Sequence, residues 1–127
     1  MTAAGFRRLA LGLTDAIEGA HMGHPDFRVN GRIFATVHAD SAHGMVKLTP
    51  EQQQRFISEN PEAFAPESGA WGRAGCTRVT LKAVDEDTLG EALTLAWQST
   101  AAQSPARRSN RAAAPKRIAK KRDGFGI

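Results

Sequence analysis

The sequence predicts an α+β fold, in which helices pack on one face of a small antiparallel β-sheet, followed by a flexible basic C-terminal tail. Apolar residues recur at helical spacing near both ends of the first hundred positions, and a hairpin signal lies between them. The composition then changes near residue 100. The 127 residues suffice for one compact domain, which we assign to residues 1–99, with the tail at 100–127.

The first expected element is an amphipathic helix. Phe6, Leu9, Ala10, Leu13 and Ile17 recur at helical spacing. Gly12 and the Thr14-Asp15 pair weaken the helical pattern, so we expect the helix to end before Ile17. His24-Pro25 then reads as a turn.

A β-hairpin is the clearest local signal in the chain. Asn30-Gly31 separates the apolar stretches 27–29 and 32–37, and both residues accept the positive φ angles of a type I′ turn. A third short strand is expected at residues 44–48, after a polar loop. These strands form one side of the predicted sheet.

Helix-start signals organise the second half. Thr49 can cap a helix that has Pro50 at its first position and Gln52 completing a capping box, and this helix runs to about Ser58. Residues 62–74 are expected to form a loop with a short strand near 63–65, and residues 76–82 alternate as a strand with one buried face. Asp85 then caps a last helix, whose buried face carries Leu89, Leu93, Ala96 and Trp97.

Several protein classes are excluded by composition. No apolar run reaches the roughly 18 residues of a membrane span, and no charged segment leads into the apolar stretch of a signal peptide. A single cysteine, Cys76, cannot form an internal disulfide. We therefore expect a cytoplasmic protein.

Positive charge is concentrated at the C-terminus. Residues 1–100 hold nine basic and twelve acidic residues, a net charge of −3, whereas residues 101–127 hold eight basic residues and Asp123, a net charge of +7. Such a tail would neutralise phosphates and release counterions, which gives sequence-independent affinity for nucleic acid. A solubilising arm and attraction to any polyanion are the alternatives. The basic residues are Arg107, Arg108, Arg111, Lys116, Arg117, Lys120, Lys121 and Arg122.

The body offers a second candidate surface for nucleic acid. A cationic sheet face with an aromatic side chain could grip phosphates and stack a base. Half-exposed sheets also display arginine without any function, and a tryptophan in a Gly-flanked loop can simply close the edge of the core. The candidate residues are Arg28, Arg32, Lys47, Trp71, Arg73 and Arg78.

Several stretches, taken in order, resemble the MmcQ/YjbR-like family. They are residues 8–11, 23–35, 48–52, 71–73 and 77–79, with Ala96-Trp97 in the closing helix. The sequence departs from the family pattern at Arg32, where lysine is usual, and at Cys76, where an aromatic residue is common. The resemblance implies a two-layer α+β fold similar to secretion chaperones. It also implies DNA binding.

Signals for metal binding and catalysis are weak. His21-x-x-His24 with Asp26, and His38-x-Asp40-x-x-His43, contain metal-capable ligands but lack cysteine partners, so no metal or other cofactor is expected. Cys76 lacks a signature of an activated thiolate, and Asp85-Glu86-Asp87 is explained by a helix N-terminus.

The sequence thus predicts a non-enzymatic protein that binds nucleic acid, DNA rather than RNA, with low sequence specificity. The alternative is a protein-interaction module that binds a peptide or a protein partner.

Overall fold

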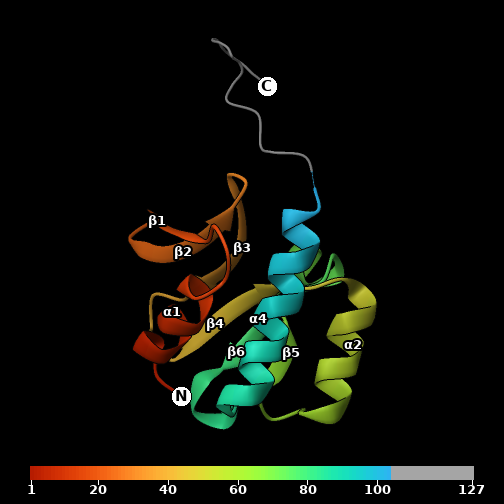
Figure 1. Ribbon diagram of the computed structural model, residues 1–127. Coiled ribbons are helices and arrows are strands. Elements are labelled where there is room, and N and C mark those ends of the chain that lie inside the picture. The colour runs from red at the N-terminus through yellow and green to blue at the C-terminus, as the bar shows by residue number, and fades with distance from the viewer. Residues whose placement is uncertain (104–127) are drawn as a thin grey trace.

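The computed structural model describes residues 1–103 and confirms the α+β class (Figure 1). Of the predicted tail at 100–127, residues 100–103 are described, and α4 continues past the predicted boundary to Ala101; the rest of the predicted tail lies outside the described residues. The elements are α1 (Ala3–Leu11), β1 (Ile17–His21), β2 (His24–Val29), β3 (Arg32–Val37), β4 (His43–Lys47), α2 (Pro50–Glu59), β5 (Phe64–Pro66), α3 (Gly69–Arg73), β6 (Cys76–Thr80), the 3₁₀ turn η1 (Leu81–Ala83) and α4 (Glu86–Ala101).

The six strands form one antiparallel sheet in the order β1-β2-β3-β4-β6-β5. Figure 1 shows α4 crossing the middle of the sheet, with α1 on one side of it and α2 on the other. These helices pack on one face of the sheet. Neither α1 nor α4 covers the opposite face. We call the two sides the helical layer and the open face.

The core lies between the sheet and the helical layer. Phe6 of α1, Phe27 of β2 and Leu93 of α4 are fully or almost fully buried, and the Phe6 and Phe27 ring centroids lie 5.9 Å apart. At Gly44 of β4 an added Cβ would lie 2.6 Å from Phe6 Cε2, so the ring rests directly on the strand. Because side chains alternate along a strand, Met45 and Lys47 point to the open face.

The predicted hairpin is confirmed. Asn30 and Gly31 have φ angles of 55° and 75°, as a type I′ turn requires. Asn30 Nδ2 also donates a hydrogen bond of 3.0 Å to the carbonyl oxygen of Ala101. The β2–β3 turn therefore holds the C-terminal end of α4.

Both predicted helix caps are confirmed. The Thr49 hydroxyl accepts from the Gln52 amide at 3.2 Å, while the Gln52 side chain accepts from the Thr49 amide at 3.0 Å. Asp85 Oδ1 accepts from the Thr88 amide at 2.7 Å, and this bond lowers the pKa of the Asp85 carboxyl.

The first helix ends before Ile17, as expected, because α1 ends at Leu11. Ile17 instead begins the edge strand β1, which the sequence analysis does not include, and is 60% exposed. One prediction for the N-terminal half is wrong. His24-Pro25 lies inside β2, because the turn falls at Met22-Gly23, whose φ angles are 51° and 84°. Pro25 can occupy this position because the β2–β3 pairing begins only at Asp26, so β3 needs no N–H from residue 25.

Two further differences concern the second half. The segment expected to be a loop contains the five-residue helix α3, and the last strand ends at Thr80 because Leu81–Ala83 form η1. The short strand expected near residue 64 is present as β5. Within residues 1–103, no helix is long and apolar enough to cross a membrane.

Candidate functional site

A groove of about 690 Å³ lies on the open face. It extends from the β1–β2 turn, across β2, β3, β4 and β6, to the segment that links β5 to α3. Its lining includes four uncharged side chains of β3, β4 and β6, Ile33, Thr36, Met45 and Cys76, which we call the floor. The volume falls within the range of roughly 300–1,000 Å³ that is typical of small-molecule sites.

The groove brings together four of the residues predicted from sequence: Arg28, Arg32, Lys47 and Trp71. The three cations come from the neighbouring strands β2, β3 and β4, and Trp71 comes from α3. Among the described residues, Glu67 is the only one with a carboxylate that lines the groove. The groove is therefore cationic, although the body as a whole is acidic.

The other two predicted residues of the body lie outside the groove. Arg78 is opposite Met45 in the β4–β6 pairing, so it shares the open face with the groove. Arg73 is exposed at the end of α3 and does not line the groove. The eight predicted residues of the tail lie outside the described part of the chain.

Arg28 is positioned by a buried carboxylate. Asp26 is 0% exposed and accepts from Arg28 Nε at 2.7 Å and from Arg28 Nη2 at 3.0 Å. The same carboxylate lies 2.7 Å from His21 Nδ1. The hydrogen bonds from Arg28 hold the pKa of Asp26 below its usual value, and Asp26 raises the pKa of Arg28 in turn.

A glycine of β1 leaves room for this ion pair. Gly19 is opposite Asp26 in the register, and a Cβ there would lie 2.9 Å from Asp26 Oδ1 and 3.0 Å from Arg28 Nε. A larger residue would push the Arg28 guanidinium away from its carboxylate partner.

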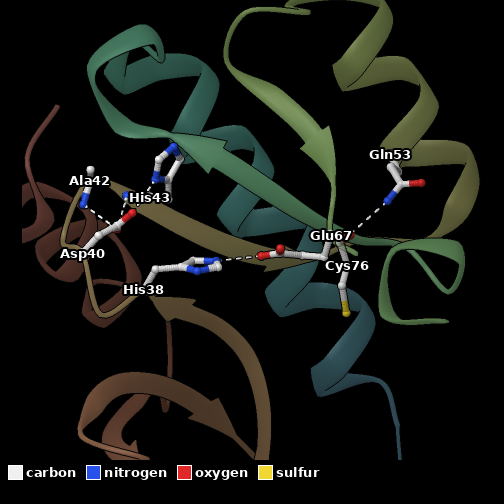
Figure 2. A network of polar contacts seen from close by, with 7 residues as sticks. All are labelled: His38, Asp40, Ala42, His43, Gln53, Glu67 and Cys76. Carbon is white, nitrogen blue, oxygen red and sulfur yellow. Dashed lines mark hydrogen bonds and ion pairs between the residues drawn. The ribbon is translucent and has the colours of Figure 1, made fainter. Parts of the chain in front are cut away.

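The second histidine motif, His38-x-Asp40-x-x-His43, has a structural explanation (Figure 2). His38 Nε2 lies 2.7 Å from Glu67 Oε2, which ties the end of β3 to the β5–α3 segment. Asp40 accepts from the amides of Ala42 and His43 and lies 2.8 Å from His43 Nδ1. The hydrogen bond with His43 is the main reason that the pKa of Asp40 falls to about 2. Among residues 1–103, no group of three or more His, Cys, Asp and Glu side chains is arranged to hold a metal ion.

Trp71 is presented to solvent by a tightly packed turn. It is 72% exposed, so it does not close the edge of the core. An added Cβ at Gly72 would lie 1.8 Å from the carbonyl oxygen of Glu67, and one at Gly75 would lie 2.0 Å from that of Leu48. Gln53 of α2 donates to the carbonyl oxygen of Gly72 at 3.0 Å and to that of Cys76 at 3.1 Å; Figure 2 shows the contact with Cys76. These contacts fix α3, and with it the position of Trp71.

Cys76 lies on the groove floor opposite Lys47. The residue is buried, and this burial raises the pKa of its thiol. The protonated thiol is a small apolar group and a poor nucleophile. Sequence reasoning anticipated the buried strand position but not the place of the thiol in the groove.

Apart from Arg28, which pairs with the buried Asp26, the cations of the two sides differ in their partners. Arg7, Arg8 and Arg55 of the helical layer form ion pairs with Glu18, Glu86 and Glu91. In contrast, Lys47, Arg73 and Arg78 pair with no carboxylate among residues 1–103.

The fold and the groove together define a small α+β protein with a cationic groove on the uncovered face of its sheet. The YjbR family model matches residues 11–99, so the chain belongs to the YjbR family, as the sequence motifs indicated. A comparison with curated proteins gives no match. The chain is also similar to the crystal structure of Deinococcus radiodurans protein DR2400, from the DUF419 family. The two share 21% identity over 80% of each chain with a TM-score of 0.67, which shows a common fold.

Proposed function

We propose that this protein binds nucleic acid through phosphate contacts, without catalysis and with little sequence preference. The observation that carries the proposal is the gathering of cations on the open face, where Lys47 and Arg78 lack carboxylate partners among residues 1–103. Residues 1–100 carry a net charge of −3, so acidic residues are in excess there. They pair with Arg7 and Arg55 but not with Lys47 or Arg78. Unpaired cations around a groove suit an anionic polymer, because phosphate neutralisation releases counterions.

The basic tail supports the same function. Its eight cations would add phosphate contacts that carry no sequence information. We also propose a cytoplasmic location, where a free cysteine such as Cys76 stays reduced and nucleic acid is accessible.

A salt series with the full chain and duplex DNA tests the proposal. Each phosphate contact contributes about −0.9 to the slope of log affinity against log salt. Replacing Lys47 and Arg78 by Gln should reduce the slope by about 2, and replacing all eight tail cations by Gln should reduce it by up to about 7. The matched control replaces Arg8 and Lys82 by Gln. These residues do not line the groove, and their replacement removes the same amount of charge.

Three results would count against the proposal. If the full chain binds neither the duplex nor a single strand at low salt, nucleic-acid binding is wrong. If the tail variant loses all binding, the groove has no part in it. If the control variant loses as much as the groove variant, affinity follows net charge and not the open face.

A second candidate function is a protein-interaction module, which the apolar groups around the groove favour. Met22 in the β1–β2 turn is 92% exposed, and Ile33 and Met45 lie on the floor. An apolar peptide would bind with little dependence on salt, because ionic screening does not weaken apolar contacts. The salt series therefore separates the two candidates.

A further inference from the structure

The groove combines apolar surface with an exposed aromatic ring. Ile33, Met45 and the protonated Cys76 supply the floor, and Trp71 stands at the rim with most of its ring surface in solvent. An exposed tryptophan held on a rigid turn loses little conformational freedom when a flat group stacks on it. The floor and rim thus suit a planar, largely apolar group.

The charged and polar groups of the groove suit the phosphate and the ring edges of such a ligand. Arg28, Arg32 and Lys47 line it from the central strands, and the Arg28 guanidinium is held in place by the buried Asp26. The His38–Glu67 pair (Figure 2) and Ser68 add hydrogen-bonding groups to the lining, and Glu67 and Ser68 shortly precede Trp71 along the chain. A ligand that satisfies all three features carries a negative charge, a flat ring and polar ring edges.

A base within a duplex cannot use this groove, since it is paired and stacked between its neighbours. Taking it out of the duplex costs a few kcal/mol. We propose that the groove takes an unpaired nucleotide of a single-stranded nucleic acid, with the base over the floor against Trp71 and phosphates at Arg28, Arg32 and Lys47. This inference rests on the proposed function, which it narrows from phosphate binding in general to single strands.

The test compares two oligonucleotides of about 12 units, a length within the usual range of single-strand sites. One is oligodeoxythymidine, and the other carries abasic sites at every position, so that it keeps the phosphates and lacks the bases. Loss of one stacked base lowers affinity about 5- to 150-fold. The full chain should bind the abasic strand more weakly by this factor, and Trp71→Ala should bind both strands equally.

Trp71→Phe is the matched variant, because phenylalanine keeps a stacking surface and should retain most of the preference for bases. A second readout uses Trp97→Phe, which leaves Trp71 as the single tryptophan of the chain. Trp97 belongs to the helical layer, where its Nε1 donates to the carbonyl oxygen of Thr14 at 2.9 Å. Oligodeoxythymidine should quench the remaining fluorescence, and the abasic strand should not.

The outcomes distinguish this inference from the proposed function. If both strands and a duplex of equal length bind the full chain equally, and Trp71→Ala changes nothing, the inference is wrong while phosphate binding stands. If no nucleic acid binds at low salt, both are wrong. Oligouridine in place of oligodeoxythymidine identifies the source of the strand, because tighter binding of the ribose form indicates contacts with the 2′-hydroxyl group.

Discussion

The helical layer and the open face of the same sheet treat charge in opposite ways. Arg7, Arg8 and Arg55 pair with carboxylates of neighbouring elements in the helical layer. On the open face, Lys47 and Arg78 pair with none of the described carboxylates, and the one buried carboxylate there serves to position Arg28. One side therefore pairs its cations within the protein, whereas the other leaves Lys47 and Arg78 without a carboxylate partner among the described residues, which is the feature on which the proposed function rests.

The largest expected effect comes from removing the carboxylate beneath the groove. Asp26→Asn should destabilise the protein by about 2–3 kcal/mol at pH 6, since the buried acceptor of the Arg28 guanidinium loses its charge. The folded-state pKa of Asp26 lies below its usual value of 3.8, so its contribution is complete above about pH 5. As the pH falls toward 2, the carboxyl becomes protonated and the stability gap between wild type and variant should shrink.

Urea denaturation at a series of pH values measures this gap. Glu62→Gln is the control, because Glu62 is exposed and its loss should cost less than about 0.5 kcal/mol at any pH. A gap for Asp26→Asn that stays constant from pH 6 to pH 2 would contradict the proposed role of the charge.

A smaller effect is expected where the helical layer holds the groove wall. Gln53→Leu leaves the carbonyl oxygens of Gly72 and Cys76 without their donor, which should destabilise the protein by about 2 kcal/mol. It should also weaken binding of a stacked base, since α3 carries Trp71. Gln54→Leu is the matched control, because the neighbouring glutamine is exposed. Equal losses in the two variants would show that the buried hydrogen bonds have no special importance.

The smallest expected effects test whether a cation on each side of the sheet raises or lowers the free energy of unfolding. Arg55→Gln should destabilise the protein by up to about 1 kcal/mol, because Arg55 pairs with Glu91 and lies 4.5 Å from the centre of the Phe56 ring. Arg78→Gln should leave stability unchanged or raise it by a few tenths of a kcal/mol, since it removes a cation from a cationic face. Denaturation at low and high salt measures both. The electrostatic contribution to the difference in stability between the two variants should disappear at high salt. If Arg78→Gln destabilises the protein, the contrast between the helical layer and the open face is wrong.

Local signals in the sequence predicted the elements that have their own start and stop residues. Asn30-Gly31, Thr49 with Gln52, and Asp85 act through hydrogen bonds or φ angles within a few positions, so their structural effects could be recognised without the fold. The edge strand β1 lacks such a signal. Its Gly19 is required by the Asp26–Arg28 ion pair that it covers, and this requirement appears only when β1 is paired with β2.

The candidate site shows the same division. Arg28, Arg32, Lys47 and Trp71 could be named from residue type, but the groove that unites them depends on the curvature and order of six strands. The His38–Glu67 contact joins residues 29 positions apart, and no local pattern predicts it. Helix α3 was missed because two of its five residues are glycines, which disfavour helices, and Gly72 is needed only because the Glu67 backbone lies against it.

The hydrogen bond between Asn30 and Ala101 has a consequence for avidity. It fixes the end of α4 at the β2–β3 turn, whose next residues, Gly31 and Arg32, line the groove. The end of α4 therefore lies beside the groove. Under the proposed function, a strand bound in the groove would be presented to the basic segment at a high effective concentration, so that two weak contacts together would give a tight complex.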